Sequence, residues 1–219
     1  LLISVGTTLV GTFLGLALST LGAYVLIQWD MPGRTFFANF LLFTMIFNGG
    51  MIPTYLVMKN LGLTNNLLGV VLLPAINIYN LVLMRNFFEG IPQSLFEAAT
   101  LDGCTPMATF IKVVLPLSKA VIAVLILYYA VYHWNDFFNA LMFNSNNDND
   151  PLQIVLRSIL LLNEAFANGT GAGAGGYGQM FAEQVKYAAI IVSTLPILCV
   201  YPFIQKYFEK GVMIGAVKG

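Results

Sequence analysis

The sequence predicts an all-α protein, a polytopic membrane helix bundle with five transmembrane helices. Of its 219 residues, 58% are hydrophobic and only 9% are charged, and the mean hydropathy is +0.79. Soluble domains carry about 25% charged residues, so a chain this apolar cannot cover a surface that faces water. Five long runs without a charged residue approach the roughly 20 apolar residues that a helix needs to cross a bilayer. We therefore expect a single transmembrane domain over residues 1–219.

Charge and cysteine content exclude other classes of protein. The formal net charge is zero, which argues against a nucleic-acid partner. Cys104 and Cys199 form neither a CxxC pair nor a metal-ligand spacing, so we expect two small apolar fillers and no metal site.

Leu1 follows no initiator methionine and no basic lead-in. We therefore expect a fragment whose N-terminal span is missing.

The first expected span is Leu1–Gln28, which contains no charged residue. Small residues recur along it at roughly helical spacing, a pattern that suits close packing of helices inside a bundle. These small residues are Gly6, Gly11, Gly15, Ser19 and Gly22.

Two more spans are expected before the first strongly polar region. Thr35–Asn48 is the second, and helix breakers after it predict that Ile52–Leu61 is a separate short helix at the interface. Asn60–Met84 is the third, with Pro74 in its middle. A proline at membrane depth marks either a kink for packing or a mobile element of the pathway, and we favour packing.

The polar insert after the third span is expected to form two short helices. Ser94 and Glu97 have the S-x-x-E spacing of a capping box, which predicts the start of a helix. Gly103 suits the end of that helix, because glycine adopts the left-handed conformation without penalty. Thr105 and Pro106 predict the N-cap and first residue of the next helix. Two helices with a tight break between them make a compact knob suited to docking.

The second half of the chain contains two more spans and a long loop between them. Ala120–Asn135 begins the fourth span, and Tyr187–Gln205 is the fifth. Leu152–Phe166 is amphipathic and is expected to be an interfacial or surface helix. Asn168–Gly178 is rich in glycine and is expected to be flexible.

The distribution of lysine and arginine predicts the orientation. With five spans, seven of the ten basic residues fall on one side of the membrane and three on the other. Cytoplasmic loops carry the excess of basic residues. We therefore expect residues 85–119 and the C-terminus in the cytoplasm and the loop of residues 143–184 outside. The seven are Arg34, Arg85, Lys112, Lys119, Lys206, Lys210 and Lys218; the three are Lys59, Arg157 and Lys186.

Seven residues of the polar insert follow the pattern E-A-A-x3-G-x9-hydrophobic-x-L-P, namely Glu97, Ala98, Ala99, Gly103, Val113, Leu115 and Pro116. This spacing resembles the EAA loop of ABC importer permeases. In that family the loop is a cytoplasmic coupling helix that fits a cleft on the ATP-hydrolysing subunit. The alternative is a capped helix–turn–helix that joins spans 3 and 4 for structural reasons alone. The resemblance implies coupling roles for Glu97, Ala98, Ala99, Asp102, Gly103, Leu115 and Pro116.

Three further stretches extend the likeness over nearly the whole chain. Asn65-Asn66-Leu67, Trp134-Asn135-Asp136-Phe137 and Gly211–Gly219 resemble the maltose-type sugar permeases, in particular the complex-saccharide and alginate-oligosaccharide group. The resemblance implies a multi-pass permease subunit of the bacterial inner membrane that translocates a sugar or oligosaccharide. Its implied partners are an ABC ATPase dimer, a second homologous permease, an extracytoplasmic solute-binding protein, the sugar and membrane lipid. The chain itself is then no enzyme and holds no cofactor, since ATP and Mg²⁺ belong to the ATPase.

Several polar residues of the spans are candidates for a sugar path. Asn77, Asn80, Tyr128 and Tyr129 offer amides and rings, but they could equally bridge helices. His133 and Asp136 lie three residues apart, and we interpret them as a hydrated pair at the outer interface rather than a proton relay.

Two other functions are alternatives to the importer. A proton-coupled secondary transporter needs ionisable residues in the middle of spans, and the five uncharged runs have none. An intramembrane enzyme needs a nucleophile–base pair or metal ligands at membrane depth. With one histidine and no H-E-x-x-H pattern, that function is disfavoured.

Overall fold

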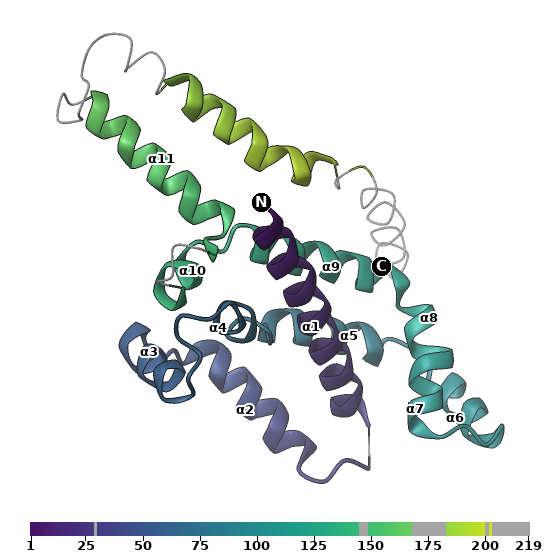
Figure 1. Ribbon diagram of the computed structural model, residues 1–219. Coiled ribbons are helices and arrows are strands. Elements are labelled where there is room, and N and C mark those ends of the chain that lie inside the picture. Colours follow the sequence, from purple (N-terminus) through teal and green to yellow (C-terminus); the bar gives the residue numbers. More distant parts are fainter. Residues whose placement is uncertain (29, 145–148, 168–182, 200–201, 203–219) are drawn as a thin grey trace.

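The computed structural model describes residues 1–28, 30–144, 149–167, 183–199 and 202, and every regular element in them is a helix (Figure 1). The predicted all-α class is therefore confirmed for this part of the chain. The glycine-rich stretch 168–178 and the C-terminal tail lie outside the described residues. The helices are α1 (Leu2–Ile27), α2 (Arg34–Ile46), α3 (Met51–Asn60), α4 (Leu67–Leu72), α5 (Ile78–Glu89), α6 (Gln93–Leu101), α7 (Pro106–Thr109), the π-helical turn η1 (Phe110–Val114), α8 (Leu115–Leu117), α9 (Lys119–Trp134), α10 (Phe138–Phe143) and α11 (Leu152–Ala167), and residues 183–199 are also helical.

Helix α1 is the one described helix that is long and apolar enough to cross a membrane by itself. Two bent pairs of helices reach that length together. The pair α2 and α3 bends by 118°, and the pair formed by Pro106–Leu117 and α9 bends by 83°. The described residues thus hold one membrane-length helix, or up to three if each bent pair is one span. The predicted count of five spans stays a prediction.

The predicted third span, Asn60–Met84, is broken into two helices. Helix α4 ends at Leu72, and α5 begins at Ile78 after Asn77, whose side-chain oxygen accepts a hydrogen bond from the Asn80 backbone N–H at 3.2 Å. Pro74 lies in the break, where its missing N–H removes a helical hydrogen bond. The irregularity expected at Pro74 is therefore a break between two helices, and its proposed role in packing stays a prediction. The described part of the predicted fifth span is helical to residue 199.

The main core surrounds α1, which packs against α9 and α5 (Figure 1). Its buried side chains also come from η1, so the polar insert and the spans share one core. They are Ala23, Tyr24, Met84, Phe88, Phe110, Val114, Val121 and Leu125. A second, smaller core joins α3, α4 and α10 through Met58, Val70, Ala140 and Phe143.

The contact between α1 and α9 is close because small residues face large ones. A Cβ atom on Gly15 would lie 2.6 Å from Cε1 of Tyr129, and a Cβ atom on Gly11 would overlap the His133 ring. The predicted packing role is thus confirmed at these two glycines. Gly6 differs, because no atom lies within 4 Å of a Cβ placed there.

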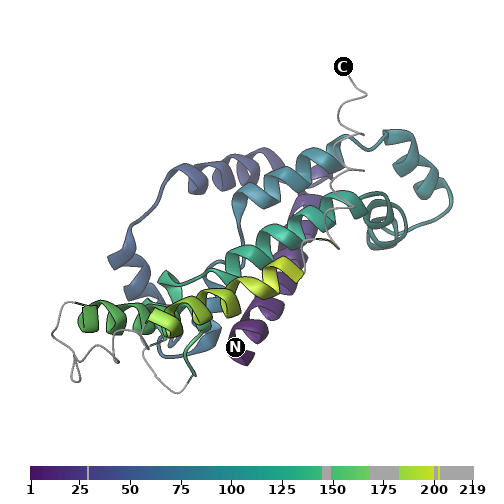
Figure 2. The same ribbon diagram turned by 90° about the horizontal axis from the view of Figure 1, so that it is seen from above.

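Helices α3 and α11 form where the sequence predicts short peripheral helices. Helix α3 is the short helix expected over Ile52–Leu61, and α11 is the amphipathic helix expected over Leu152–Phe166. Helix α2 buries none of its side chains, and its row of phenylalanines is exposed, as suits contact with lipid. Helix α11 and the helix of residues 183–199 run side by side in both views (Figures 1 and 2).

Gly15→Ala is expected to destabilise the protein relative to Gly6→Ala. Both changes remove one glycine from α1 and so share the same gain in helix propensity. Only Gly15→Ala forces a methyl group into the Tyr129 ring, and overpacking of this kind costs about 1–3 kcal/mol. The thermal unfolding of each purified variant in detergent measures the difference. Equal unfolding temperatures would show that α1 and α9 are not in close contact.

Candidate functional site

The polar insert forms a knob beyond the ends of the long helices. Figure 1 shows α6, α7 and α8 gathered at the lower right, past the ends of α5 and α9. We call residues 93–117, from the start of α6 to the end of α8, the coupling segment, after the role that the sequence resemblance implies for it. The two predicted helices are present, separated by the predicted tight turn.

The start of α6 differs from the prediction. The helix begins at Gln93, one residue before Ser94, and no side chain caps it. Pro92 holds an extended conformation (φ −56°, ψ 132°) in the N-cap position, and its carbonyl accepts a hydrogen bond from the Leu95 N–H at 3.1 Å. Because proline fixes its own φ and has no N–H to satisfy, it starts the helix without a capping box. The predicted box of Ser94 and Glu97 was therefore wrong.

The end of α6 is as predicted. Gly103 has φ +74°, which an L-residue adopts only at a cost. The Gly103 N–H donates to the Thr100 carbonyl at 3.0 Å, and the Cys104 N–H donates to the Ala99 carbonyl at 2.9 Å. These two bonds define a Schellman motif, which satisfies the last carbonyls of the helix.

The second helix of the coupling segment begins as predicted and then widens. The Thr105 hydroxyl accepts a hydrogen bond from the Ala108 N–H at 3.3 Å, and Pro106 is the first helical residue. Residues 110–114 form the π-helical turn η1, which the sequence reading did not anticipate. Its signal was Pro116, which cannot donate a helical hydrogen bond, so the preceding turn has to adjust.

The residues proposed for coupling differ in exposure. Glu97, Ala98, Asp102, Gly103 and Pro116 are exposed, Leu115 is half-buried, and Ala99 is buried against its own chain. Sequence reasoning missed a set of large apolar side chains on the same segment. Leu101 is 88% exposed, and Leu95, Met107 and Ile111 are exposed too. An apolar surface on a polar insert is the kind of patch that marks a protein interface.

Tyr24 ties the coupling segment to α1. Its hydroxyl donates a hydrogen bond to the Pro106 carbonyl at 2.8 Å, across 82 positions of sequence. Its ring lies 4.8 Å, centroid to centroid, from the ring of Phe110 in η1. No local pattern marks this tyrosine, because both of its partners are distant in sequence. It nevertheless joins the segment to the first helix through two contacts.

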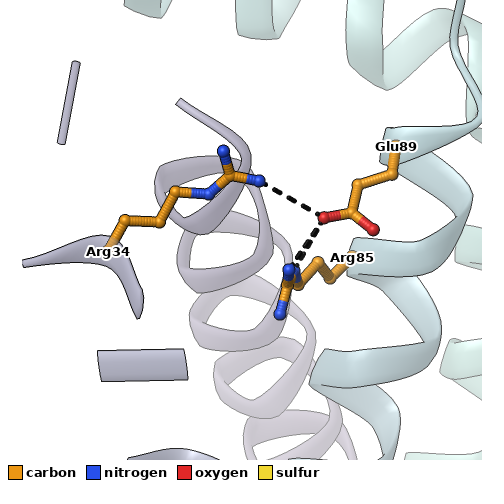
Figure 3. Close-up of polar contacts among 3 residues, drawn as sticks. All are labelled: Arg34, Arg85 and Glu89. Atoms are coloured by element: carbon orange, nitrogen blue, oxygen red, sulfur yellow. Dashed lines mark hydrogen bonds and ion pairs between the residues drawn. The ribbon is translucent and has the colours of Figure 1, made fainter. Parts of the chain in front are cut away.

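Two arginines share one carboxylate near the base of the coupling segment (Figure 3). One side-chain nitrogen of Arg85 lies 2.8 Å from Oε1 of Glu89, and one of Arg34 lies 3.4 Å from the same atom. The cluster joins the first turn of α2 to the last turn of α5. Ion pairs that are this exposed contribute about 1 kcal/mol or less, so its role is to fix position more than to stabilise.

The candidates for a sugar path fall into two groups. Tyr129 is buried, its hydroxyl lies 2.6 Å from the Ser19 hydroxyl, and it accepts a hydrogen bond from the Asn77 backbone N–H at 3.2 Å. Asn80 is buried beside Asn77. Tyr128 is 40% exposed and belongs to another face of α9. Three of the four therefore meet around α1, and the contacts that Tyr129 makes bridge helices.

The expected hydrated pair of His133 and Asp136 is wrong, because His133 is buried and its Nε2 has no hydrogen-bond partner within the described residues. His133 lies against Gly11 of α1. The Asp136 carboxylate accepts hydrogen bonds from the backbone N–H and side-chain amide of Asn139, at 3.2 Å and 3.0 Å, and so caps the start of α10. Burial raises the pKa of the Asp136 carboxyl, and the bonds from Asn139 oppose that shift.

Within the described residues, no cluster of histidine, cysteine or carboxylate side chains could hold a metal ion.

Comparison with known proteins identifies relatives over the whole chain. The family described as "Binding-protein-dependent transport system inner membrane component" matches residues 31–214. The chain is 43% identical to the polygalacturonan/rhamnogalacturonan transport system permease protein YtcP of Bacillus subtilis (strain 168), over 100% of this chain and 76% of that protein. It is 44% identical to protein LplC of the same organism, over 99% of this chain and 73% of that protein.

A solved structure has a similar fold. It is described as the crystal structure of a bacterial ABC transporter involved in the import of the acidic polysaccharide alginate. The TM-score is 0.83 at 35% sequence identity, over 94% of this chain and 73% of that one. The arrangement of helices in this chain is therefore that of an ABC transporter subunit.

Tyr24→Phe is expected to loosen the coupling segment without unfolding the bundle. The change keeps the ring contact with Phe110 and removes one hydrogen bond, worth about 1 kcal/mol. Amide hydrogen exchange in residues 106–114 should then become roughly fivefold faster. Thr20→Val is the matched control, because the Thr20 hydroxyl bonds only to the α1 carbonyls of Leu16 and Ala17. If both variants speed exchange equally in this segment, the link through Tyr24 is wrong.

Proposed function

The chain belongs to the family of inner membrane components of binding-protein-dependent transport systems, and from this premise we propose that it is the permease subunit of an ATP-binding-cassette importer that moves an oligosaccharide across a bacterial inner membrane. One observation carries the proposal: the identity of 43%, over all 219 residues of this chain, to a permease named for the transport of polygalacturonan and rhamnogalacturonan. The family is a transport component and not an enzyme family. The chain would therefore move its substrate across the membrane without changing it chemically.

The importer that we propose has three further protein parts. A second, homologous permease completes the pathway, and an extracytoplasmic solute-binding protein delivers the sugar. Two ATPase subunits supply the energy and hold the ATP and Mg²⁺, so this chain needs no cofactor of its own. The relatives' membership of binding-protein-dependent and ABC systems supports this composition.

We assign the coupling to the segment of residues 93–117. Its Schellman motif and its Thr105 cap make it rigid, and its apolar side chains Leu101 and Met107 provide a surface that an ATPase cleft can cover. Closure of the ATPase dimer would pull the segment, and Tyr24 would carry that displacement to α1. This is a two-state element biased by a ligand bound elsewhere.

The orientation and the span count belong to the same proposal. Residues 85–119 and the C-terminus face the cytoplasm, and residues 143–184 face outward. The seven-to-three distribution of basic residues supports this arrangement. Within five spans, α4 and α5 together make the third, and their break near Pro74 lies at membrane depth. Asn77, Asn80, Tyr128 and Tyr129 remain the proposed residues of the sugar path.

Leu101→Cys tests the orientation. With Cys104 and Cys199 replaced by serine, the new cysteine is the only one in the chain. Leu101 is 88% exposed, so a membrane-impermeant maleimide should label it readily. We expect labelling in inverted membrane vesicles and little or none in intact spheroplasts. Labelling from outside alone would reverse the proposed topology.

Glu97→Lys tests the coupling. Reversing an exposed charge on the docking surface should abolish uptake of a labelled oligosaccharide, and the ATPase should no longer copurify with the permease. The variant should still insert in the membrane, because Glu97 is exposed and forms no ion pair within the described residues.

Asp30→Lys is the control for this experiment. It makes the same charge change at an exposed residue on the same proposed side, outside the coupling segment. Normal uptake by Glu97→Lys, or equal loss in both variants, would contradict the assignment of coupling to this segment.

A further inference from the structure

A pocket lies between α11 and the helix of residues 183–199, near the end of α9. Its volume is about 370 Å³, within the range of small-molecule sites. Apolar side chains from both helices form most of its lining. Arg157 from α11 and Lys186 from the facing helix add two positive charges, so residues 29 positions apart place like charges in one pocket.

Neither charge has a carboxylate partner in the part of the chain that the structure describes. The ion pairs found there join Glu89 to Arg34 and to Arg85. Glu164 and Glu183 stand on the same two helices as the pocket, yet neither pairs with Arg157 or Lys186. Two like charges that line one pocket without a counter-charge repel each other, and a bound anion would relieve that repulsion.

The arginine is held in place by its neighbours. Its guanidinium carbon lies 5.3 Å from the centroid of the Phe137 ring, a cation–π contact. The floor of the pocket is fixed as well, because the side-chain amide of Gln153 donates to the Trp134 carbonyl at 3.2 Å. A guanidinium group that lies against a ring can donate two parallel hydrogen bonds to a planar carboxylate.

The position of the pocket indicates what kind of anion reaches it. In the proposed orientation, the outer side carries three basic residues, Lys59, Arg157 and Lys186, and two of them line this pocket. The substrate approaches from that side. We propose that Arg157 and Lys186 form a binding site for the carboxylate groups of an acidic oligosaccharide on its way into the permease. The inference rests on the proposed function, and it adds the residues that would hold the carboxylates of the substrate.

The test uses the complete importer, reconstituted in liposomes with its ATPase, second permease and binding protein. Two probes are compared, a trimer of galacturonate and the same trimer with its carboxyl groups methyl-esterified. Arg157→Gln with Lys186→Gln should raise the KM for the acidic trimer about tenfold or more, since two charge-assisted hydrogen bonds are lost. Uptake of the ester and the ATP hydrolysis rate should stay unchanged.

Two matched variants sharpen the result. Arg157→Lys keeps the charge but loses the planar guanidinium, so it should lower the affinity for the acidic trimer less than Arg157→Gln does. Lys59→Gln removes the third outer charge, away from the pocket, and should leave uptake of both probes at the normal level. If Lys59→Gln raised the KM for the acidic trimer equally, the effect would come from the overall positive charge of the outer face. The proposed site would then be wrong.

The remaining outcomes separate the possible failures. If the wild-type importer takes up neither probe, the proposed oligosaccharide function fails. If it takes up the acidic trimer and the double variant does so equally well, this inference alone fails. If the loss in the double variant appears only in liposomes that contain anionic lipid, the pocket binds a lipid headgroup, and the inference is overturned.

Discussion

Helix α1 lies close to α9 because Gly11 and Gly15 present no side chain where His133 and Tyr129 need room. This contact determines what else can reach α1. The Tyr129 ring, seated over Gly15, places its hydroxyl 2.6 Å from Ser19 and 3.2 Å from the backbone N–H of Asn77, just before α5. Three helices are thereby joined at one buried point. In a bilayer, where lipid is as apolar as the side chains, such close packing and hydrogen bonding hold helices together.

The same pair of helices connects the two ends of the molecule. At one end, Tyr24 of α1 bonds to Pro106, and Phe110 and Val114 of η1 complete the core around it. At the other end, the Ser4 hydroxyl accepts a hydrogen bond from the Leu152 N–H at 2.6 Å, which fixes the start of α11. A displacement of the coupling segment and a displacement of the outer helices therefore act on the same α1.

How much the sequence predicts depends on how far apart the interacting residues are. The helical class follows from composition, and the end of α6 and the start of α7 follow from Gly103 and Thr105, whose hydrogen bonds stay within five residues. The start of α6 was misplaced because a capping-box spacing at Ser94 coexists with a stronger signal, Pro92. At Pro74 the sequence predicts a kink, and the structure has a break between α4 and α5. The role of Tyr24 could not be predicted, because its hydrogen-bond partner lies 82 residues away in the sequence.

The cations at the two ends of the bundle need different explanations. Arg34 and Arg85 share the carboxylate of Glu89 at the proposed cytoplasmic end. Basic residues on that side orient a membrane protein, so their presence there needs no ligand to explain it. Arg157 and Lys186 stand at the proposed outer end, where the same rule disfavours them, and they meet in one pocket. Arg157 and Lys186 thus stand on the side that the rule disfavours, and neither has a carboxylate partner within the described chain. A ligand that brings the opposite charge is the best explanation for them.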